Sequence, residues 1–283
     1  MTTLSPARLD AQYNARAAIP DHAQIFARWR VRSAAAREAL RSELDYYYGS
    51  TAAQTLDLFP ARNHGSPLLI FIHGGYWRAL DKSDFSFLAP AFVDAGVSVA
   101  IVNYALLPQV TLEEIVRQML RACAWTWRNA PGFGVDPNRL YLSGHSAGGH
   151  LTAMMLAADW PTYARDLPDR LVRGGLAVSG VFDLRPLARA PFIRDDLRLD
   201  VAAARRLSPV AYTPRRNVPL YLCVGGNESA EFHRQASLMR RAWPHCFAGE
   251  VTMPGHHHLS VIEQLASPGS ALFRTALRMM GTV

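Results

Sequence analysis

The sequence predicts an α/β fold: a mostly parallel central sheet with helices on both faces. From Thr55 onward, apolar strand-like runs alternate with helical runs, at a spacing typical of parallel strands joined by helices. The run "VSVAIVNY" at 97–104 is apolar at nearly every position, as expected of a strand buried on both faces of a sheet. With 283 residues, 49% of them hydrophobic, the chain accommodates one large domain at least as well as two small ones.

The chain divides into two parts with different patterns. Residues 1–50 are expected to form an N-terminal helical arm, with a helix at 33–45 and no long strand-like run, and residues 51–283 the main domain. The predicted strands of the main domain are 55–59, 68–72, 97–104, 139–144, 174–182, 220–226 and 246–253. Its predicted helices are 83–96, 111–130, 149–159, 229–243 and 267–280. Thr111 is suited to cap the second of these helices, because two acidic residues follow within its first turn.

One long segment interrupts the alternation of strands and helices. Residues 184–217 contain four prolines and no strand-like run. A segment of this length between two core strands is more often a lid or a binding insertion than an empty loop. We therefore expect a small cap at 184–217, over the carboxyl ends of the strands.

Composition excludes several classes of function. The 30 basic and 23 acidic residues give a net charge of +7, but the arginines are scattered and Lys82 is the only lysine, so no nucleic-acid partner is expected. The three cysteines, Cys123, Cys223 and Cys246, lack metal-ligand spacing and are interpreted as buried thiols in a reducing compartment. The N-terminus has no signal-peptide pattern, and no run has the ~18 apolar residues of a membrane span. We expect a cytoplasmic protein without a membrane partner.

A strand-to-helix turn carries the first chemical signal. In "LYLSGHSAGGHL" at 140–151 an apolar strand meets a helix around Ser146, which is flanked by Gly144 and Gly148. This spacing, G-x-S-x-G, is typical of a nucleophilic serine held on a sharp, strained turn with its hydroxyl above the sheet. The glycines do not fit the G-x-G-x-x-G pattern of dinucleotide binding, and no lysine stands where a phosphate-binding loop needs one.

A second glycine-containing turn follows an earlier strand. "HGGYW" at 73–77 places Gly74, Gly75 and Tyr76 directly after the strand-like run at 68–72. Attack by a serine on a carbonyl carbon creates an oxyanion, which backbone N–H groups stabilise. We expect these donors at the loop of Gly74, Gly75 and Tyr76 and at Ala147, the residue after the serine. His73 is expected to brace the loop.

A serine nucleophile also needs a histidine base and an orienting acid. After the last strand stand His256, His257 and His258; consecutive histidines do not all point one way, so no metal site is expected there. His258 is the first candidate for the base and His257 the second. Glu228, at the end of a predicted strand, is the first candidate for the acid, with two alternatives, Glu231 and Asp183.

These motifs resemble the arylformamidase (kynurenine formamidase) branch of the α/β-hydrolases, which is related to the hormone-sensitive-lipase-like esterases. The resemblance rests on "HGGYW" and "GHSAGGH", and it extends to "YNARAAIPD", "YYGSTAAQTLDLFPA", "SGVFDLRPL", "LSPV" and "ESAEFHRQ". It implies a Ser146–acid–His258 triad, an oxyanion loop at 74–76, and hydrolysis of N-formylkynurenine or similar aryl amides and esters. One departure concerns the acid: the family usually has aspartate where this chain has Glu228.

The sequence therefore predicts a serine hydrolase that acts on a small, aryl ester or N-formyl amide and needs no cofactor. Tyr76, Trp77 and Tyr13 are candidate walls of an aromatic pocket. A general short-chain esterase, an acyltransferase with the same triad, and a non-catalytic binding protein of the same fold remain alternatives. The expected partner is a small-molecule substrate, and the oligomeric state stays open, with a homodimer among the open states.

Overall fold

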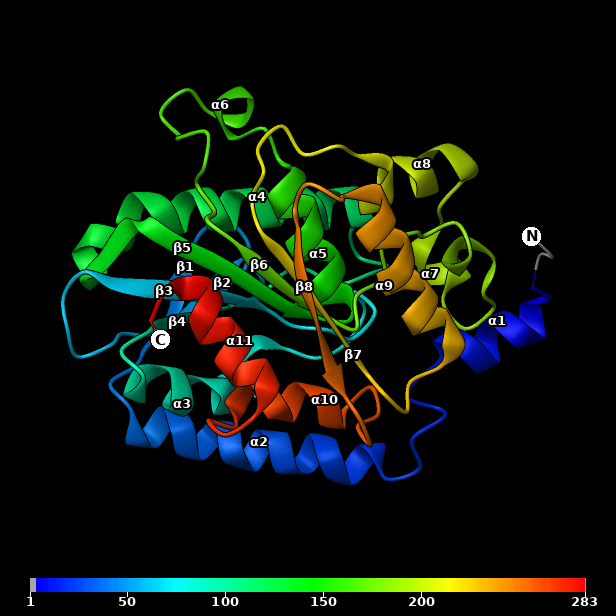
Figure 1. Ribbon diagram of the computed structural model, residues 1–283, viewed down its shortest axis with the longest axis horizontal. Helices are drawn as coiled ribbons and strands as arrows, with labels where there is room; N and C mark the ends of the chain where they lie inside the picture. The colour runs from blue at the N-terminus through cyan, green and yellow to red at the C-terminus, as the bar shows by residue number, and fades with distance from the viewer. Residues whose placement is uncertain (1–3, 283) are drawn as a thin grey trace.

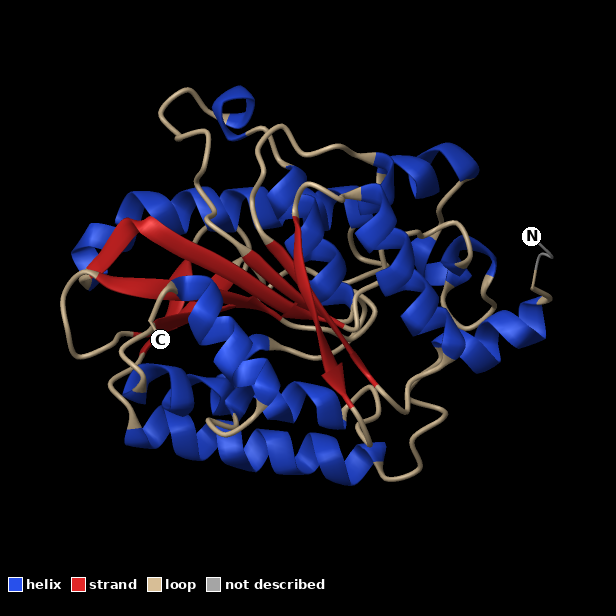
Figure 2. Ribbon diagram, viewed as in Figure 1, coloured by secondary structure: helices blue, strands red, loops and turns tan. Residues whose placement is uncertain are grey.

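The computed structural model describes residues 4–282, and its centre is one eight-stranded sheet (Figures 1 and 2). The strand order is β1-β2-β4-β3-β5-β6-β7-β8. The pairs β1–β2 and β2–β4 are antiparallel, and the other five pairs are parallel. The mostly parallel sheet predicted from the sequence is confirmed. The strands are β1 Glu43–Tyr47, β2 Thr55–Phe59, β3 Ser66–Ile72, β4 Ser98–Val102, β5 Val135–His145, β6 Gly175–Val178, β7 Leu220–Gly225 and β8 Phe247–Met253.

Helices cover both faces of the sheet (Figure 1). On one face lie α4, α5 and α9, and on the other α2, α3, α10 and α11. The helices are α1 Pro6–Tyr13, α2 His22–Ala39, α3 Ala89–Asp94, α4 Leu112–Asn129, α5 Ala147–Ala157, α6 Trp160–Tyr163, α7 Arg194–Leu197, α8 Val201–Arg206, α9 Ala230–Ala242, α10 Ser260–Glu263 and α11 Ala271–Met280. The hydroxyl of Thr111 accepts from the backbone N–H of Glu114 at 3.2 Å, as the capping pattern predicts.

Strand β3 shows why the sheet needs both layers. Side chains alternate along a strand, so neighbouring residues point to opposite faces. Leu68, Ile70 and Ile72 lie in the core shared with α4 and α5, whereas Leu69 and Phe71 lie in the core shared with α2, α3 and α11. All seven residues of β3 are buried. The strand is therefore apolar on both faces, and it holds the loop that follows Ile72 in a fixed place.

The N-terminal 50 residues differ from the predicted helical arm. The helix expected at 33–45 is in fact α2, at 22–39, and residues 43–47 form the edge strand β1. The helical prediction is therefore wrong for residues 40–45, of which 43–45 belong to the strand. This segment forms backbone hydrogen bonds with β2, and this pairing is stronger than its local preference for a helix. The arm thus divides among α1, α2 and one strand of the sheet.

Residues 184–217 contain two short helices, α7 and α8, and no strand. They lie beside α1, at the right of Figure 1. The backbone N–H of Phe192 donates to Oδ1 of Asp10, just within α1, at 3.1 Å. The predicted cap segment and the N-terminal segment therefore meet at the same edge of the sheet, the edge where the parallel strands end.

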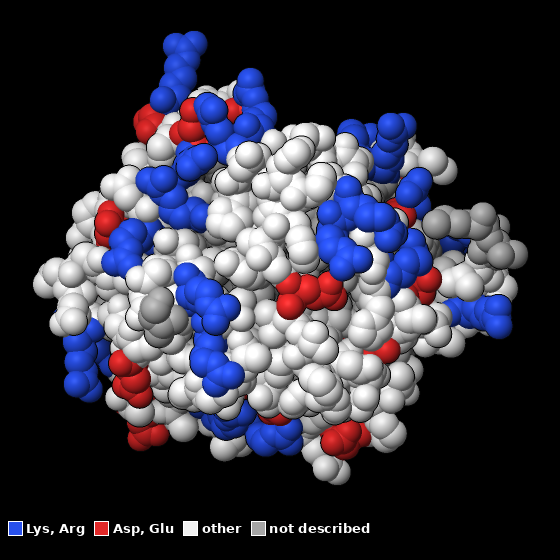
Figure 3. All heavy atoms as spheres, viewed as in Figure 1, with Lys and Arg blue, Asp and Glu red and all other residues white. Residues whose placement is uncertain are grey.

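The surface matches the scattered charge of the sequence. On the face drawn in Figure 3, basic side chains stand in several separate groups with acidic side chains among them. Among residues 4–282, no helix is long and apolar enough to cross a membrane.

Candidate active site

Ser146 occupies the turn between β5 and α5, as the G-x-S-x-G spacing predicts. Its backbone is strained, with φ 57° and ψ −115°. The flanking glycines allow the turn, because a Cβ atom on Gly144 would lie 2.2 Å from the carbonyl oxygen of Gly148. A Cβ atom on Gly148 would lie 1.9 Å from the carbonyl oxygen of Ile72. No side chain fits at either position, so the turn depends on glycine.

The structure brings Ser146, His258 and Glu228 into one chain of hydrogen bonds. Oγ of Ser146 lies 3.0 Å from Nε2 of His258, and Nδ1 of His258 lies 2.6 Å from Oε2 of Glu228. A carboxylate accepts, so Nδ1 carries the proton and Nε2 is free to accept from the serine hydroxyl. The side chain of His258 is 7% exposed and that of Glu228 is 0% exposed. The arrangement has the geometry of a nucleophile, a base and an orienting acid.

Glu228 is held by more than the histidine. Its second oxygen, Oε1, accepts from the backbone N–H of Gly225 at 2.8 Å and from the hydroxyl of Ser179. Gly225 ends β7, and Ser179 directly follows β6 with a φ of 51°. Two adjacent parallel strands therefore fix the carboxylate. Because Oε1 is held by these two donors, Oε2 of Glu228 stays directed at Nδ1 of His258.

The three alternative candidates for base and acid lie outside this hydrogen-bond chain. Nδ1 of His257 accepts from the backbone N–H groups of its own turn, at 3.2 Å each. Glu231 pairs with Arg234 and accepts from the hydroxyl of Tyr13 at 2.7 Å. Asp183 pairs with Arg185 at 2.8 Å. None of the three contacts His258 through a hydrogen bond, whereas Glu228 does.

The loop after β3 turns sharply next to Ser146. Gly75, Tyr76 and Trp77 have φ values of 104°, 51° and 56°, and a Cβ atom on Gly75 would lie 2.1 Å from the carbonyl oxygen of Ala79. A Cβ atom on Gly74 would lie 3.2 Å from that of Ser146. The loop therefore reaches the serine through glycine backbone.

The N–H groups of this loop are available to a ligand. Within residues 4–282, the backbone N–H groups of Gly75, Tyr76 and Ala147 donate to no protein acceptor. The ring of His73 lies beside the loop, 2.8 Å from the carbonyl oxygen of Gly74 and 3.0 Å from Oδ1 of Asn103. Free donors in a braced loop next to a serine hydroxyl are what an oxyanion hole requires.

His145, which precedes Ser146 in the turn, connects this turn to the loop that carries His258. Its Nε2 donates to the carbonyl oxygen of His258 at 2.8 Å, and the two rings lie 4.7 Å apart. Burial and the neighbouring ring of His258 hold the pKa of His145 well below its usual 6.5. A neutral His145 therefore adds no positive charge beside His258.

Two of the three predicted pocket walls lie elsewhere. Trp77 is fully buried and packs edge-on against the ring of His150, with centroids 5.1 Å apart. Tyr13 is fully buried too, and its hydroxyl is taken up by Glu231 and Gln235. Neither lines the cavity beside the serine, because both point into the core beneath it. Tyr76 does line that cavity.

The cavity beside Ser146 has a volume of about 70 Å³. Four aromatic side chains and two arginines stand in its walls, and of these six only Tyr76 was predicted from the sequence. These residues come from the N-terminal segment, α2, the loop after β3 and the segment 184–217: Arg16, Phe26, Trp29, Tyr76, Arg78 and Phe192. No local pattern marks the other five, since they meet only when the chain closes over the sheet.

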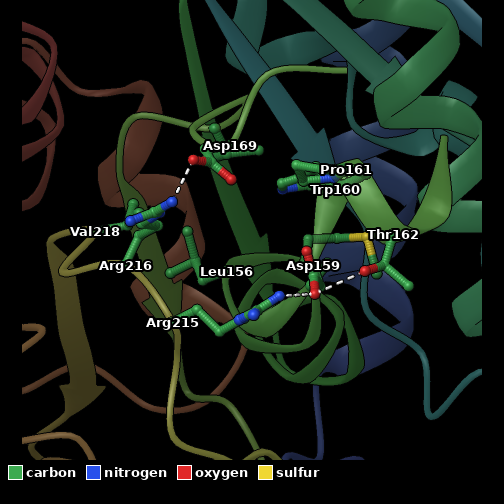
Figure 4. Close-up of a pocket in the computed structure, with 12 residues that line it drawn as sticks. Leu156, Asp159, Trp160, Pro161, Thr162, Asp169, Arg215, Arg216 and Val218 are labelled. Carbon is green, nitrogen blue, oxygen red and sulfur yellow. Dashed lines mark hydrogen bonds and ion pairs between the residues drawn. The ribbon is translucent and has the colours of Figure 1, made fainter. Parts of the chain in front are cut away.

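A second cavity, of about 330 Å³, lies at the opposite edge of the sheet (Figure 4). Its walls include the end of α5 and the residues that precede β6 and β7, so it adjoins the amino ends of these strands. Arg215 and Arg216 reach toward it and pair with Asp159 and Asp169. Ser146, His258 and Glu228 do not line it.

The fold is that of an α/β-hydrolase. The crystal structure of a candidate thioesterase from Silicibacter sp. tm1040 matches with a TM-score of 0.84 and 34% identity, covering 94% of this chain and 97% of that chain. Esterase B from Lactobacillus rhamnosis matches in fold, with a TM-score of 0.75 and 23% identity, covering 98% of this chain and 94% of that one.

Sequence comparison narrows this class. The BD-FAE family model matches residues 56–162. Kynurenine formamidase from Salmo salar is 31% identical over 256 residues, which are 87% of this chain and 84% of that protein. Its counterpart from Danio rerio is 30% identical over 255 residues, with the same coverage of 87% and 84%. The chain belongs to the arylformamidase (kynurenine formamidase) and esterase branch of the α/β-hydrolases. It is a serine hydrolase of esters or formamides.

Proposed function

We propose that Ser146, His258 and Glu228 are the catalytic triad of this hydrolase. The observation that carries the proposal is the unbroken path from the serine hydroxyl through Nε2 and Nδ1 of His258 to Glu228. Nε2 takes the proton of Ser146 while Oγ attacks the carbonyl carbon. The imidazolium that forms is stabilised by the carboxylate of Glu228. It then protonates the leaving amine or alcohol as the bond to the acyl carbon breaks.

Water completes the cycle by the same route. His258 removes a proton from a water molecule, which attacks the acyl group on Ser146, and the proton returns to Oγ as the ester bond breaks. In both steps the carbonyl oxygen becomes an oxyanion. The loop of Gly74, Gly75 and Tyr76, together with Ala147, is proposed as the oxyanion hole. This is supported by the free N–H groups of Gly75, Tyr76 and Ala147.

The proposed substrate is an N-formyl aryl amide such as N-formylkynurenine, which would yield kynurenine and formate. Support comes from the two kynurenine formamidases that this chain resembles over 87% of its length. The aromatic side chains in the walls of the cavity beside Ser146 also suit an aryl group. A short-chain ester or thioester is the second candidate, and the likeness to a candidate thioesterase at 34% identity favours the thioester.

The first experiment measures kcat/KM for N-formylkynurenine beside a series of short-chain p-nitrophenyl esters. We expect the formamide to react within the common range of about 10⁴–10⁸ M⁻¹s⁻¹. If only the esters react, the proposed triad stands and the proposed formamide substrate is wrong. Ser146→Ala is the blank, and full activity of this variant would overturn the triad.

A second readout tests the alternative of a non-catalytic binding protein. A serine-reactive fluorophosphonate is expected to label the wild-type protein and to leave Ser146→Ala unlabelled. Absence of label on the folded wild-type protein would contradict the triad and favour a binding role.

We also propose a reducing, cytoplasmic compartment and a small-molecule substrate as the only class of partner. All three cysteines are free and buried, which suits a compartment without disulfide formation. The basic side chains are interspersed with acidic ones on the face shown in Figure 3, which gives nucleic acid no continuous basic surface there.

A further inference from the structure

The cavity beside Ser146 is unbalanced in charge. Two guanidinium groups, those of Arg16 and Arg78, stand in its walls, and no carboxylate does so among residues 4–282. Glu228 lies on the far side of His258 from Ser146, and its side chain is fully buried. Two like charges around one small cavity repel each other, and partial burial together with the charge of Arg78 lowers the pKa of Arg16. An anion inside the cavity would relieve this repulsion.

Arg78 is already held by the cap. Its Nη1 donates to Oδ2 of Asp196 at 2.5 Å and to the carbonyl oxygen of Phe192 at 2.8 Å. Its guanidinium also lies 5.8 Å from the centroid of the Phe192 ring. These contacts fix the cap segment against the loop after β3. Much of the charge of Arg78 is therefore neutralised by Asp196.

Arg16 has no such partner. Its guanidinium makes no hydrogen bond or ion pair with any of residues 4–282. It lies 5.3 Å from the centroid of the Phe26 ring, and Phe26 packs edge-on against Trp29 at 5.3 Å. Phe26 and Trp29 both line the cavity. The aromatic surface orients a guanidinium whose five donors remain free for a planar, bidentate acceptor.

We propose that Arg16 binds a free carboxylate on the leaving group of the substrate. The substrate class is then an aryl formamide or aryl ester that carries a carboxylate remote from the scissile bond, with its ring against Phe26 and Phe192. This inference rests on the proposed hydrolysis at Ser146. It assigns Arg16 as a specificity-determining residue. The acyl transfer itself, carried out by the proposed triad and oxyanion hole, does not need Arg16.

The test compares two substrates that differ only in this charge: N-formylkynurenine and its primary amide. For Arg16→Gln we expect KM for the carboxylate to rise roughly 10- to 100-fold, as for the loss of a charge-assisted hydrogen bond. The KM for the primary amide is expected to change by less than about twofold, because it makes no ion pair. Arg16→Lys should retain part of the preference, since it keeps the charge without the planar fork. Arg8→Gln, an exposed arginine of α1 outside the cavity, is the control and should alter neither KM.

Equal losses on both substrates with Arg16→Gln, or no loss on either, would overturn the carboxylate site. If the wild-type protein hydrolyses neither formamide, the proposed formamide substrate fails. The same comparison is then made with 4-acetoxybenzoate and 4-acetoxybenzamide, which are cleaved as acetate esters. A rise in KM with Arg16→Gln for 4-acetoxybenzoate alone would support the carboxylate site. An equal effect of Arg16→Gln on both esters would overturn it.

Discussion

The hydroxyl of Ser179 donates a hydrogen bond to Oε1 of Glu228, the carboxylate oxygen that faces away from His258. Ser179 follows β6, Gly225 ends β7, and together they fix the acid from two adjacent strands. A glutamate side chain is one methylene longer than that of an aspartate. This second pair of contacts is what turns its remaining oxygen toward the histidine.

Removal of the Ser179 hydroxyl should therefore weaken catalysis without unfolding the protein. For Ser179→Ala we expect kcat to fall roughly 5- to 30-fold, because one neutral-to-charged hydrogen bond of about 1–2 kcal/mol is lost. The rate of fluorophosphonate labelling of Ser146 should fall in parallel. An unchanged labelling rate would show that Ser179 does not position the acid, and thermal unfolding checks that the variant folds.

Changing the acid itself should have a larger effect. Glu228→Gln keeps the shape of the side chain but removes the charge that stabilises the imidazolium of His258, so kcat should fall by about 10³–10⁴. Glu231→Gln is the matched control, since Glu231 contacts Tyr13 and Arg234 instead of the base. A loss of activity with Glu231→Gln as large as with Glu228→Gln would contradict the assignment. Steady-state kinetics on one ester substrate is sufficient.

Gly75 should tolerate no side chain. Its φ is 104°, and a Cβ atom there would lie only 2.1 Å from the carbonyl oxygen of Ala79, so Gly75→Ala must shift the loop. We expect a loss of about 2–4 kcal/mol in the free energy of unfolding. Activity should fall about 10²-fold, as for a displaced oxyanion donor. Urea denaturation and kcat measure the two effects.

Gly132→Ala serves as the control for this prediction. A Cβ atom at Gly132 meets nothing within 4 Å, and its φ lies outside the left-handed region. Its stability and activity should stay close to those of the wild-type protein. Equal effects of the two substitutions would show that the close contact between Gly75 and the carbonyl oxygen of Ala79 is not the cause of the losses in stability and activity.

The buried histidines should make stability depend on pH. Burial lowers the pKa of His150 from 6.5 to about 4, and that of His145 also lies well below 6.5. Below pH 6.5 the unfolded chain binds protons that the folded chain does not, so the free energy of unfolding falls as the pH falls. Each histidine contributes at most about 1.4 kcal/mol per pH unit. This loss continues until the pH reaches the folded pKa.

Urea denaturation at pH 7.5 and at pH 5 measures this loss. His150→Gln should reduce the difference in unfolding free energy between the two pH values by about 2 kcal/mol, because one of the titrating groups is gone. The comparison is of the two differences, so a change in stability common to both pH values does not enter. An undiminished difference would contradict a neutral, buried His150.

Local patterns in the sequence were sufficient to predict the α/β fold and the sharp turn that holds Ser146. Alternation of apolar runs reports burial within a few residues, and "GHSAGG" and "HGGYW" report backbone turns that only glycine allows. Such signals need no knowledge of distant parts of the chain. The helix expected at 33–45 is wrong at its C-terminal end for the converse reason, because strand β1 exists through its pairing with β2.

The choice among the acids and the lining of the cavity depend instead on tertiary packing. Asp183, Glu228 and Glu231 all follow or adjoin strands in the sequence, yet one alone reaches His258, since side-chain direction depends on how β6, β7 and the last loop pack together. Tyr13 and Trp77 are aromatic in the sequence and core residues in the fold. Arg16 and Phe192 are 176 positions apart (192 minus 16) and line one cavity. Contacts across such separations form only when the chain closes, so no local pattern encodes them.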